Sequence, residues 1–161
     1  MSLKDLYVTP GHLIRRAQQI AVACFMEECA EMDLTPVQYA AMLAIQEHPG
    51  IDAARLSGMI AFDRGTICDV IRRLGIKGLV SREHTPDDQR IKLITLTAEG
   101  KRTLKRADNS VKRAQDRILE PLNPADRSKL VELLGKVVKV NNEVSRAPLR
   151  PLEKISANKS A

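Results

Sequence analysis

Apolar and polar positions along this chain repeat mainly with the period of an α-helix. The clearest example follows Asp63, which can cap a first helical turn. Apolar side chains then recur at steps of three and four residues, at Ile67, Val70, Ile71 and Leu74. That spacing places them on one side of a helix. The pattern predicts an amphipathic helix with one buried face and one polar face.

Two short β-prone runs follow this helix. They are Val80–His84 and Ile91–Leu96, and Gly78 stands where the helix is expected to end. The residues between the runs, 85–90, are polar and include a proline, which is typical of a turn. This order predicts an antiparallel hairpin.

Helix start signals also occur on the N-terminal side, after a lead-in of residues 1–8. Thr9 is a capping residue followed by a proline at the first helical position, which predicts a helix over residues 10–32. Thr35 and Gln38 have the spacing of a capping box and predict a second helix that ends near residue 48.

A third helix is predicted to lead directly into the helix after Asp63. Asp52 can cap it, it extends through Met59, and residues 61–62 form the turn. Two helices joined by a short turn and followed by a hairpin are typical of a winged helix-turn-helix. The predicted fold class is therefore mostly α with a small β-hairpin, and residues 34–96 form the winged helix-turn-helix.

The terminal helices carry more apolar surface than one small domain can bury. Thr97 can cap a long helix whose apolar positions are Leu104, Ala107, Val111, Ala114 and Ile118. A last helix, after Asn123, carries Leu130, Leu133, Leu134, Val137, Val138, Asn141 and Val144. A twofold partner would cover these faces, so residues 10–32 and 98–145 are expected to be the N- and C-terminal dimerisation helices of a homodimer.

The composition fits a single domain with a polyanionic partner. The chain has 161 residues, 43% of them hydrophobic, which suffices for one core. Residues 146–161 hold two prolines and small polar side chains, and we expect them to be a disordered tail. The net charge is +6, while aromatic residues make up only 2%. Duplex DNA is favoured over single strands, which are bound through aromatic stacking.

The polar face of the helix after Asp63 and the hairpin carry the candidate DNA contacts. On the helix they are Arg64, Thr66, Asp69, Arg72 and Arg73. Beyond it the positive charges are Lys77, Arg82, Arg90 and Lys92. We expect the helix to enter the major groove and the hairpin tip to reach the minor groove. Asp69 would either pair with a neighbouring arginine, which we favour, or accept a hydrogen bond from cytosine N4.

The first long helix carries an unusual polar group beside its apolar face. Its members are His12, Arg15, Arg16 and Gln19. They could form a solvated face or, together with Tyr39, surround an anionic ligand. Arginine binds a planar carboxylate through two hydrogen bonds, while histidine and tyrosine can address a ring nitrogen or hydroxyl. The second interpretation predicts an aromatic or pyridine carboxylate as effector.

Other kinds of chemistry find little support in the sequence. Cys24, Cys29 and Cys68 are odd in number, lack Cys-x-x-Cys spacing and follow no secretory signal, so we expect reduced thiols in a cytoplasmic protein. Cys68 could sense oxidants, although an unpaired cysteine is more often a small buried hydrophobe. Since no metal motif, phosphate loop, nucleophile-base pair or membrane-length apolar run is visible, we expect no metal, no cofactor and no enzymatic activity.

Together these residues resemble the MarR family of bacterial transcription regulators. Asp88-Gln89-Arg90 followed by Leu96-Thr97-Ala98-Glu99-Gly100 is similar to the family's Asp-x-Arg … Leu-Thr-x-x-Gly signature. The Gly-Leu-Val exit at residue 78 and the Leu-Thr-Pro-x-Gln start at residue 34 are similar too. The resemblance covers about residues 10–145, and residues 11–17 look like the subgroup that represses nicotinate catabolism genes.

The resemblance implies a homodimer with two recognition helices in successive major grooves. It implies that Arg90 is a minor-groove arginine whose guanidinium Asp88 orients, and that a small-molecule pocket lies between the DNA-binding and dimerisation regions. Gly65-Thr66 and Asp69 differ from the residues that the family commonly has there. The operator sequence therefore does not carry over.

The expected function is that of a ligand-responsive transcriptional repressor. It would occupy a palindromic promoter operator as a homodimer and be released by a small aromatic or pyridine carboxylate. Two alternatives remain open: a redox-responsive regulator that acts through a cysteine, and a protein-interaction module that binds no DNA.

Overall fold

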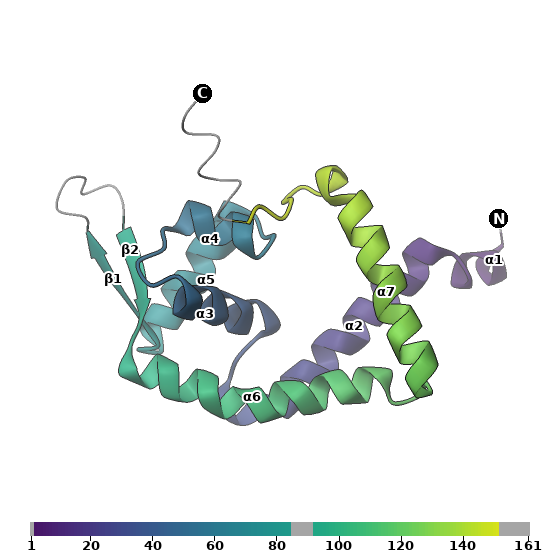
Figure 1. The fold of residues 1–161 in the computed structure, drawn as a ribbon, viewed down its shortest axis with the longest axis horizontal. Coiled ribbons are helices and arrows are strands. Elements are labelled where there is room, and N and C mark those ends of the chain that lie inside the picture. The colour runs from purple at the N-terminus through teal and green to yellow at the C-terminus, as the bar shows by residue number, and fades with distance from the viewer. Residues whose placement is uncertain (1, 85–91, 152–161) are drawn as a thin grey trace.

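The computed structural model of the protein describes residues 2–84 and 92–151 (Figure 1). Its elements are α1 (Leu3–Tyr7), α2 (Pro10–Glu28), η1 (Ala30–Met32), α3 (Pro36–Glu47), α4 (Ala53–Met59), α5 (Arg64–Ile76), β1 (Val80–His84), β2 (Lys92–Leu96), α6 (Ala98–Leu119), α7 (Pro124–Val140) and η2 (Asn142–Val144). The two strands form an antiparallel hairpin, so the predicted fold class is confirmed. Within the described ranges, no helix has the length and apolar character to cross a bilayer.

Side-chain caps begin most of the helices. Five predicted N-cap side chains accept a hydrogen bond from a backbone N–H of the first turn, and they are Thr35, Asp52, Asp63, Thr97 and Asn123. Each bond satisfies a donor that the helix itself leaves unpaired. Thr9 also lies at an N-cap position, but its hydroxyl donates to the carbonyl oxygen of Leu6 at 2.8 Å instead.

The N-terminal region differs from the prediction. The expected lead-in forms α1, because Ser2 and Asp5 make a capping box that starts a short helix. Helix α2 ends at Glu28, and the 3-10 turn η1 replaces its predicted last turn. Asp33 follows with a left-handed φ of 48° and ends this turn.

The core lies between the winged region and the first half of α6. Its largest fully buried side chains are Leu34, Met42, Ile45, Leu56, Ile67, Leu74, Ile94 and Leu104, with Cys29. Full burial of one aliphatic side chain contributes about 1.5 to 3 kcal/mol. Gly100 allows α6 to approach closely, because a Cβ there would lie 2.1 Å from the carbonyl oxygen of Leu79. The start of α6 is thereby fixed to the segment that leaves α5.

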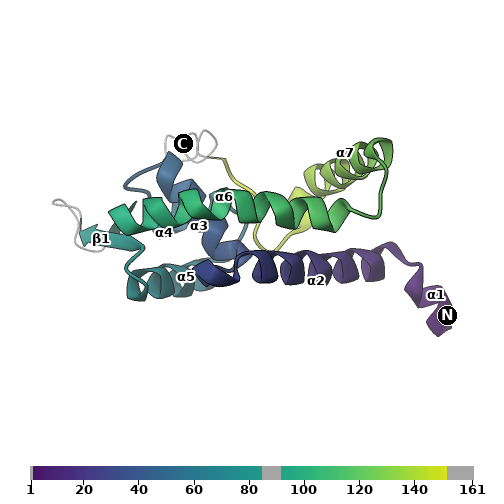
Figure 2. The same ribbon diagram turned by 90° about the horizontal axis from the view of Figure 1, so that it is seen from below.

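Helix α2 lies beside α6, as Figure 2 shows from below. The predicted apolar face of α6 takes part in this packing: Leu104, Ala107 and Ala114 are buried, and Val111 is half-buried. Much of this face is therefore covered within one chain.

Helix α7 exposes its apolar face, and none of its residues is buried. The exposed apolar side chains are Leu130, Val131, Leu133, Leu134, Val137, Val138 and Val140. Figure 1 shows α7 turning back from the end of α6 and standing apart from the winged region. A large exposed apolar surface of this kind marks an interaction site.

Residues 146–151, the first part of the expected disordered tail, hold defined positions. The backbone N–H of Leu149 donates to the side chain of Asn142 at 2.8 Å, and that of Arg150 donates to the carbonyl of Gly58 at 2.7 Å. The side-chain amide of Asn142 offers both a donor and an acceptor, which lets it hold an extended backbone. The expectation of disorder is wrong for residues 146–151, and residues 152–161 lie outside the described ranges.

Candidate nucleic-acid interface

Helix α5 is held in the winged region by its apolar face. Ile67 and Leu74 are 0% exposed and Ile71 is 4% exposed, with Val70 also buried, as the sequence predicts. The opposite face consequently points outward, and Arg64, Arg72 and Arg73 are exposed on it. An outward helical face with several arginines is the geometry that a major-groove reader needs.

The N-terminal end of α5 is organised by Asp63. Its carboxylate accepts the backbone N–H of Thr66 at 2.9 Å and the Thr66 hydroxyl at 2.6 Å. These two bonds are the main reason why the pKa of Asp63 is lowered from its usual value. The hydroxyl proton of Thr66, a predicted DNA contact, is thus used within the helix cap.

Asp69 is the internal partner that the sequence favours. Its carboxylate accepts hydrogen bonds from Arg72 at 2.5 Å and from Arg73 at 2.7 Å, so the prediction of an arginine partner is confirmed. The bond from Arg72 is the largest cause of the lowered pKa of Asp69. One carboxylate therefore orients two guanidinium groups on the outward face.

Lys77, a predicted phosphate contact, has partners within the chain. Its amino group lies 2.8 Å from the carboxylate of Asp33 and 3.5 Å from the side-chain oxygen of Gln38. It also donates to the backbone carbonyl of Asp33. Lys77 therefore ties the end of α5 to the loop before α3. Sequence reasoning missed this because Asp33 is 44 positions away.

The hairpin places two predicted cations beside α5. Its register pairs Val80 with Leu96 at one end and His84 with Lys92 at the other. A hollow of about 450 Å³ between α4, α5 and the hairpin is lined by Arg64, Arg82 and Lys92, together with Asp52, Ala53, Ala54, Cys68, Ile71 and Ile94. Three positively charged side chains from three elements therefore line the same pocket. The predicted wing-tip residues Asp88 and Arg90 lie outside the described residues.

The cysteines occupy three different environments. Cys29 is 0% exposed, and burial raises the pKa of its thiol. Cys24 is half-buried, whereas Cys68 is exposed. The expectation that Cys68 is a small buried hydrophobe is wrong, because residue 68 follows Ile67 by about 100° around the helix and falls on the outward face.

The predicted effector group is partly assembled at the start of α2. His12, Arg15 and Arg16 line one open hollow of about 510 Å³ with Tyr7 and Leu13. Arg15 also donates a hydrogen bond to Gln19 at 3.1 Å. Tyr7, whose ring centroid lies 5.5 Å from that of His12, was not predicted, since no helix was expected before Thr9.

Tyr39 does not join this group within one chain. Its ring lies 5.9 Å from that of Phe25. Burial, and then the nearby charge of Asp108, raise the pKa of the Tyr39 hydroxyl. Phe25 and His12 are on the same helix roughly 20 Å apart, given the rise of about 1.5 Å per residue. The predicted five-residue site is therefore incomplete in a single chain.

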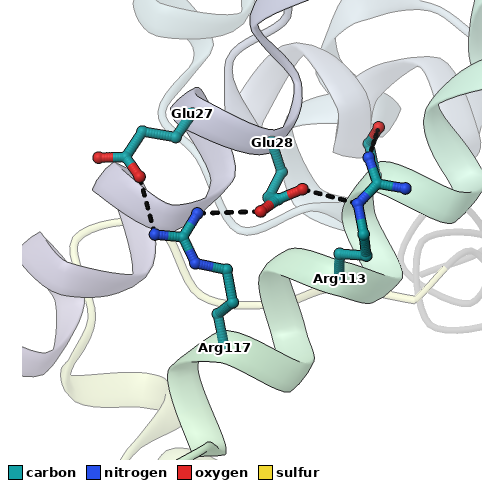
Figure 3. A network of polar contacts seen from close by, with 5 residues as sticks. Glu27, Glu28, Arg113 and Arg117 are labelled. Carbon is teal, nitrogen blue, oxygen red and sulfur yellow. Dashed lines mark hydrogen bonds and ion pairs between the residues drawn. The ribbon is translucent and has the colours of Figure 1, made fainter.

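A network of ion pairs joins α2 to α6 (Figure 3). Glu28 accepts hydrogen bonds from Arg113 at 2.7 Å and from Arg117 at 2.9 Å, and Arg117 also reaches Glu27 at 2.8 Å. Arg113 and Arg117 lower the pKa of Glu28 through these bonds, and the pKa of Arg117 is raised in return by Glu27 and Glu28. The network fixes the helix that carries His12 against the helix that follows the hairpin.

Comparison with known proteins identifies several regulators of similar sequence. Residues 34–92 match the model of the MarR family. The HTH-type transcriptional repressor NicR of Pseudomonas putida is 28% identical over 134 residues, covering 83% of this chain and 85% of NicR. The transcriptional regulator HosA of Escherichia coli O111:H- is 32% identical over 127 residues, covering 79% of this chain and 93% of HosA.

Two solved structures of similar fold are of proteins that are described together with a small-molecule ligand. PcaV from Streptomyces coelicolor, in complex with its natural ligand, has 32% identity and a TM-score of 0.75, covering 86% of this chain and 98% of PcaV. BpsR from Bordetella bronchiseptica, whose DNA binding is regulated by 6-hydroxynicotinic acid, has 31% identity and a TM-score of 0.73, covering 79% of this chain and 96% of BpsR.

Proposed function

This chain belongs to the MarR family of transcriptional regulators, and we propose that it is a ligand-responsive repressor that binds a palindromic promoter operator as a homodimer. The observation that carries the proposal is α5. Its apolar face is buried, and its opposite face presents exposed arginines beside a hairpin with further cations. Such a surface fits the major groove and the adjacent phosphates of duplex DNA.

We propose fewer DNA-contacting residues than the sequence alone predicts. Arg64, Arg72 and Arg73 on α5, with Arg82 and Lys92 on the hairpin, face outward. Arg90 and Asp88 are proposed wing-tip contacts on the family resemblance alone. We leave Lys77 out because its amino group is bound to Asp33.

Mapping the protected sites on genomic DNA, followed by titration of the protected duplex, tests this function. With roughly six to ten phosphate contacts in the dimer, affinity should fall by about 10³ to 10⁵ between 50 and 200 mM salt. Arg90→Ala should weaken binding strongly in a folded dimer, because arginine gains from the focused potential of a narrow minor groove. A protein that binds no duplex, whatever the salt, would instead be an interaction module.

The homodimer is proposed from the exposed face of α7. Leu133 and Val137 are 47% and 49% exposed in one chain, and a row of such side chains is stable in water only when another surface covers it. A second copy supplies an identical face, and twofold pairing lets both faces cover each other. Two winged regions would then be held at a fixed separation.

The proposed effector is a small aromatic or pyridine carboxylate that binds at the start of α2. His12, Arg15 and Arg16 share one hollow there, and Arg15 is held by Gln19. Regulation of BpsR by 6-hydroxynicotinic acid, a hydroxylated pyridine carboxylate, supports this class of ligand. Because Tyr39 is remote from the hollow, the proposed site now consists of His12, Arg15, Arg16 and Gln19, with Tyr7 added.

Calorimetric titration with 6-hydroxynicotinate and related acids, with and without bound DNA, tests the effector site. Ligand and DNA must weaken each other's binding by the same factor, and a tenfold factor needs about 1.4 kcal/mol of coupling. His12→Ala and Arg16→Ala should lose ligand binding, whereas Gln18→Ala, on the same exposed part of α2, should retain it. Equal ligand affinity in both states would exclude an effector of this kind.

A redox-responsive regulator is the second candidate, because Cys68 is exposed on the outward face of α5. It lines the same hollow as Arg64 and Arg82, so an oxidised or alkylated sulfur would stand between α5 and DNA. Peroxide should then release DNA from the wild-type protein and leave Cys68→Ser bound. Equal release from both proteins would rule this candidate out.

A further inference from the structure

The segment Ser145–Pro151, here called the strap, connects the end of α7 with the helix-turn-helix. Figure 1 shows it in yellow, crossing from η2 to α4. At the α7 side, the amide of Asn142 holds the backbone of Leu149 twice: the Leu149 N–H donates to Asn142 Oδ1 at 2.8 Å, and Asn142 Nδ2 donates to the Leu149 carbonyl at 3.3 Å. Arg150 adds an ion pair to Glu143 at 2.5 Å. The strap is thus fixed to the turn that ends α7.

At its other side the strap binds the end of α4. The backbone N–H of Arg150 donates to the carbonyl oxygen of Gly58 at 2.7 Å. Gly58 lies in the last turn of α4, where carbonyl groups lack the partner that the helix interior provides. The strap therefore supplies a capping hydrogen bond from a part of the chain that is remote in sequence.

The capped end of α4 is also the turn of the helix-turn-helix. After Gly58, the Phe62 N–H donates to the Ser57 carbonyl at 3.2 Å and the Ser57 hydroxyl donates to the Phe62 carbonyl at 2.7 Å. Ala61 adopts a left-handed φ of 55° within this turn. The strap is hence bound to the segment whose geometry sets the direction of α5 relative to α4.

The strap also brings a positive charge into the electrostatic environment of the start of α5. Asp63, the N-cap of α5, has a lowered pKa mainly because of its bonds to Thr66, and the positive charge of Arg146 in the strap contributes as well. Between the strap and α7 lies a hollow of about 720 Å³, lined in part by Val137, Val138 and Leu149. The strap therefore runs from the turn that ends α7 to the end of α4, and it does not pack along α7.

We propose that the strap is a positioning element that holds the α4–α5 turn at a fixed place relative to α7. In the homodimer, which this inference takes from the proposed function, α7 is the shared axis and α5 is the recognition helix. A fixed link between them sets the separation of the two recognition helices. Asn142 and Arg150 are positioning residues, since neither lies on the outward face of α5.

Two substitutions at one position in the full-length chain test the link. Arg150→Pro removes the N–H that Gly58 accepts, whereas Arg150→Ala keeps it and removes only the guanidinium. The Arg150–Glu143 pair is exposed, at 41% and 71% of the side chains, so its loss alone should change little. Arg150→Ala is consequently the matched control for charge, and Asn142→Ala is a second disruptive variant.

The measurement uses the palindromic duplex that the wild-type protein protects, and versions with the half-sites moved one base pair closer or farther apart. Relative to Arg150→Ala, Arg150→Pro should bind the native spacing up to about tenfold more weakly, the scale of one net hydrogen bond. The affinity of Arg150→Pro should also differ less between the half-site spacings. The salt dependence of its DNA binding should stay the same. Hydrogen exchange of residues 58–66 without DNA should be faster in Arg150→Pro and Asn142→Ala.

The outcomes separate this inference from the proposed function. A wild-type protein that binds no duplex overturns both. If the wild type binds, and Arg150→Pro matches Arg150→Ala in spacing preference and in hydrogen exchange, the strap has no positioning role while the function stands. Loss of affinity at every spacing by the same factor, with unchanged exchange at residues 58–66, also counts against the strap.

Discussion

Asp69 controls how much positive charge α5 presents. It is bonded to Arg72 and Arg73, so the three residues together carry one net positive charge. These side chains are 44% to 62% exposed, and exposed ion pairs contribute about 1 kcal/mol or less to stability. We therefore expect Asp69 to influence the proposed DNA binding more than folding.

Asp69→Asn should raise affinity for any duplex and lower the preference for the operator. The substitution removes one negative charge from the outward face and frees two guanidinium groups to reach phosphates. Titrations of operator and random duplex at several salt concentrations measure both effects. Glu132→Gln is the matched control, since Glu132 pairs with Lys129 and Lys136 at the same helical spacings on α7. A similar gain of affinity in both variants would mean that only net charge matters.

Lys77→Ala should leave the salt dependence of DNA binding unchanged, because its amino group is held by Asp33. Arg64→Ala should reduce the slope of the logarithm of DNA affinity against the logarithm of salt concentration by about one per lost phosphate contact. The cost of Lys77→Ala to stability should be about 1 kcal/mol or less, since Asp33 is 83% exposed. A reduced slope for Lys77→Ala would show that Lys77 leaves Asp33 to bind phosphate.

Among the elements, α2 and α6 are joined by a charge network that responds to acid. The bonds from Arg113 and Arg117 lower the pKa of Glu28 below its usual value of 4.5. A carboxylate whose folded pKa is depressed stabilises the fold above its unfolded pKa. This contribution is fully present above about pH 4.5 and is lost as pH falls toward the folded value.

Glu28→Gln should therefore lower the melting temperature at pH 7 and reduce the drop in melting temperature between pH 6 and pH 3. Glu31→Gln provides the control, because no ion pair among the described residues involves Glu31. Thermal unfolding followed by circular dichroism at each pH measures the difference. Parallel pH profiles for wild type and Glu28→Gln would show that the network adds no pH-dependent stability.

For the whole molecule, the proposed homodimer depends on the exposed apolar face of α7. Leu133→Glu or Val137→Glu would bury an unpaired charge in the proposed dimer, at a cost of about 3 to 5 kcal/mol. Light scattering should show dissociation or unfolding of these variants. Ser128→Glu, on the opposite side of α7, should remain dimeric. A well-folded wild-type monomer at micromolar concentration would contradict the proposed dimer.

The features that the sequence determined are local. Asp63, Thr97 and the other caps act within one helical turn, and the stripe from Ile67 to Leu74 follows from helical periodicity alone. The internal partner of Asp69 was also predictable, because Arg72 and Arg73 lie three and four residues away. Each of these depends on residues that the helix itself brings together.

The tertiary structure alone decided the contacts between remote residues. Lys77 binds Asp33 across 44 positions, and Arg113 binds Glu28 across 85. Tyr39 is separated from His12 because it packs on Phe25, at the far end of the same helix. A long charged side chain can pair in many ways, and which pairing forms depends on how the helices pack. That packing is set by the buried side chains of the whole core, so no single stretch of sequence specifies it.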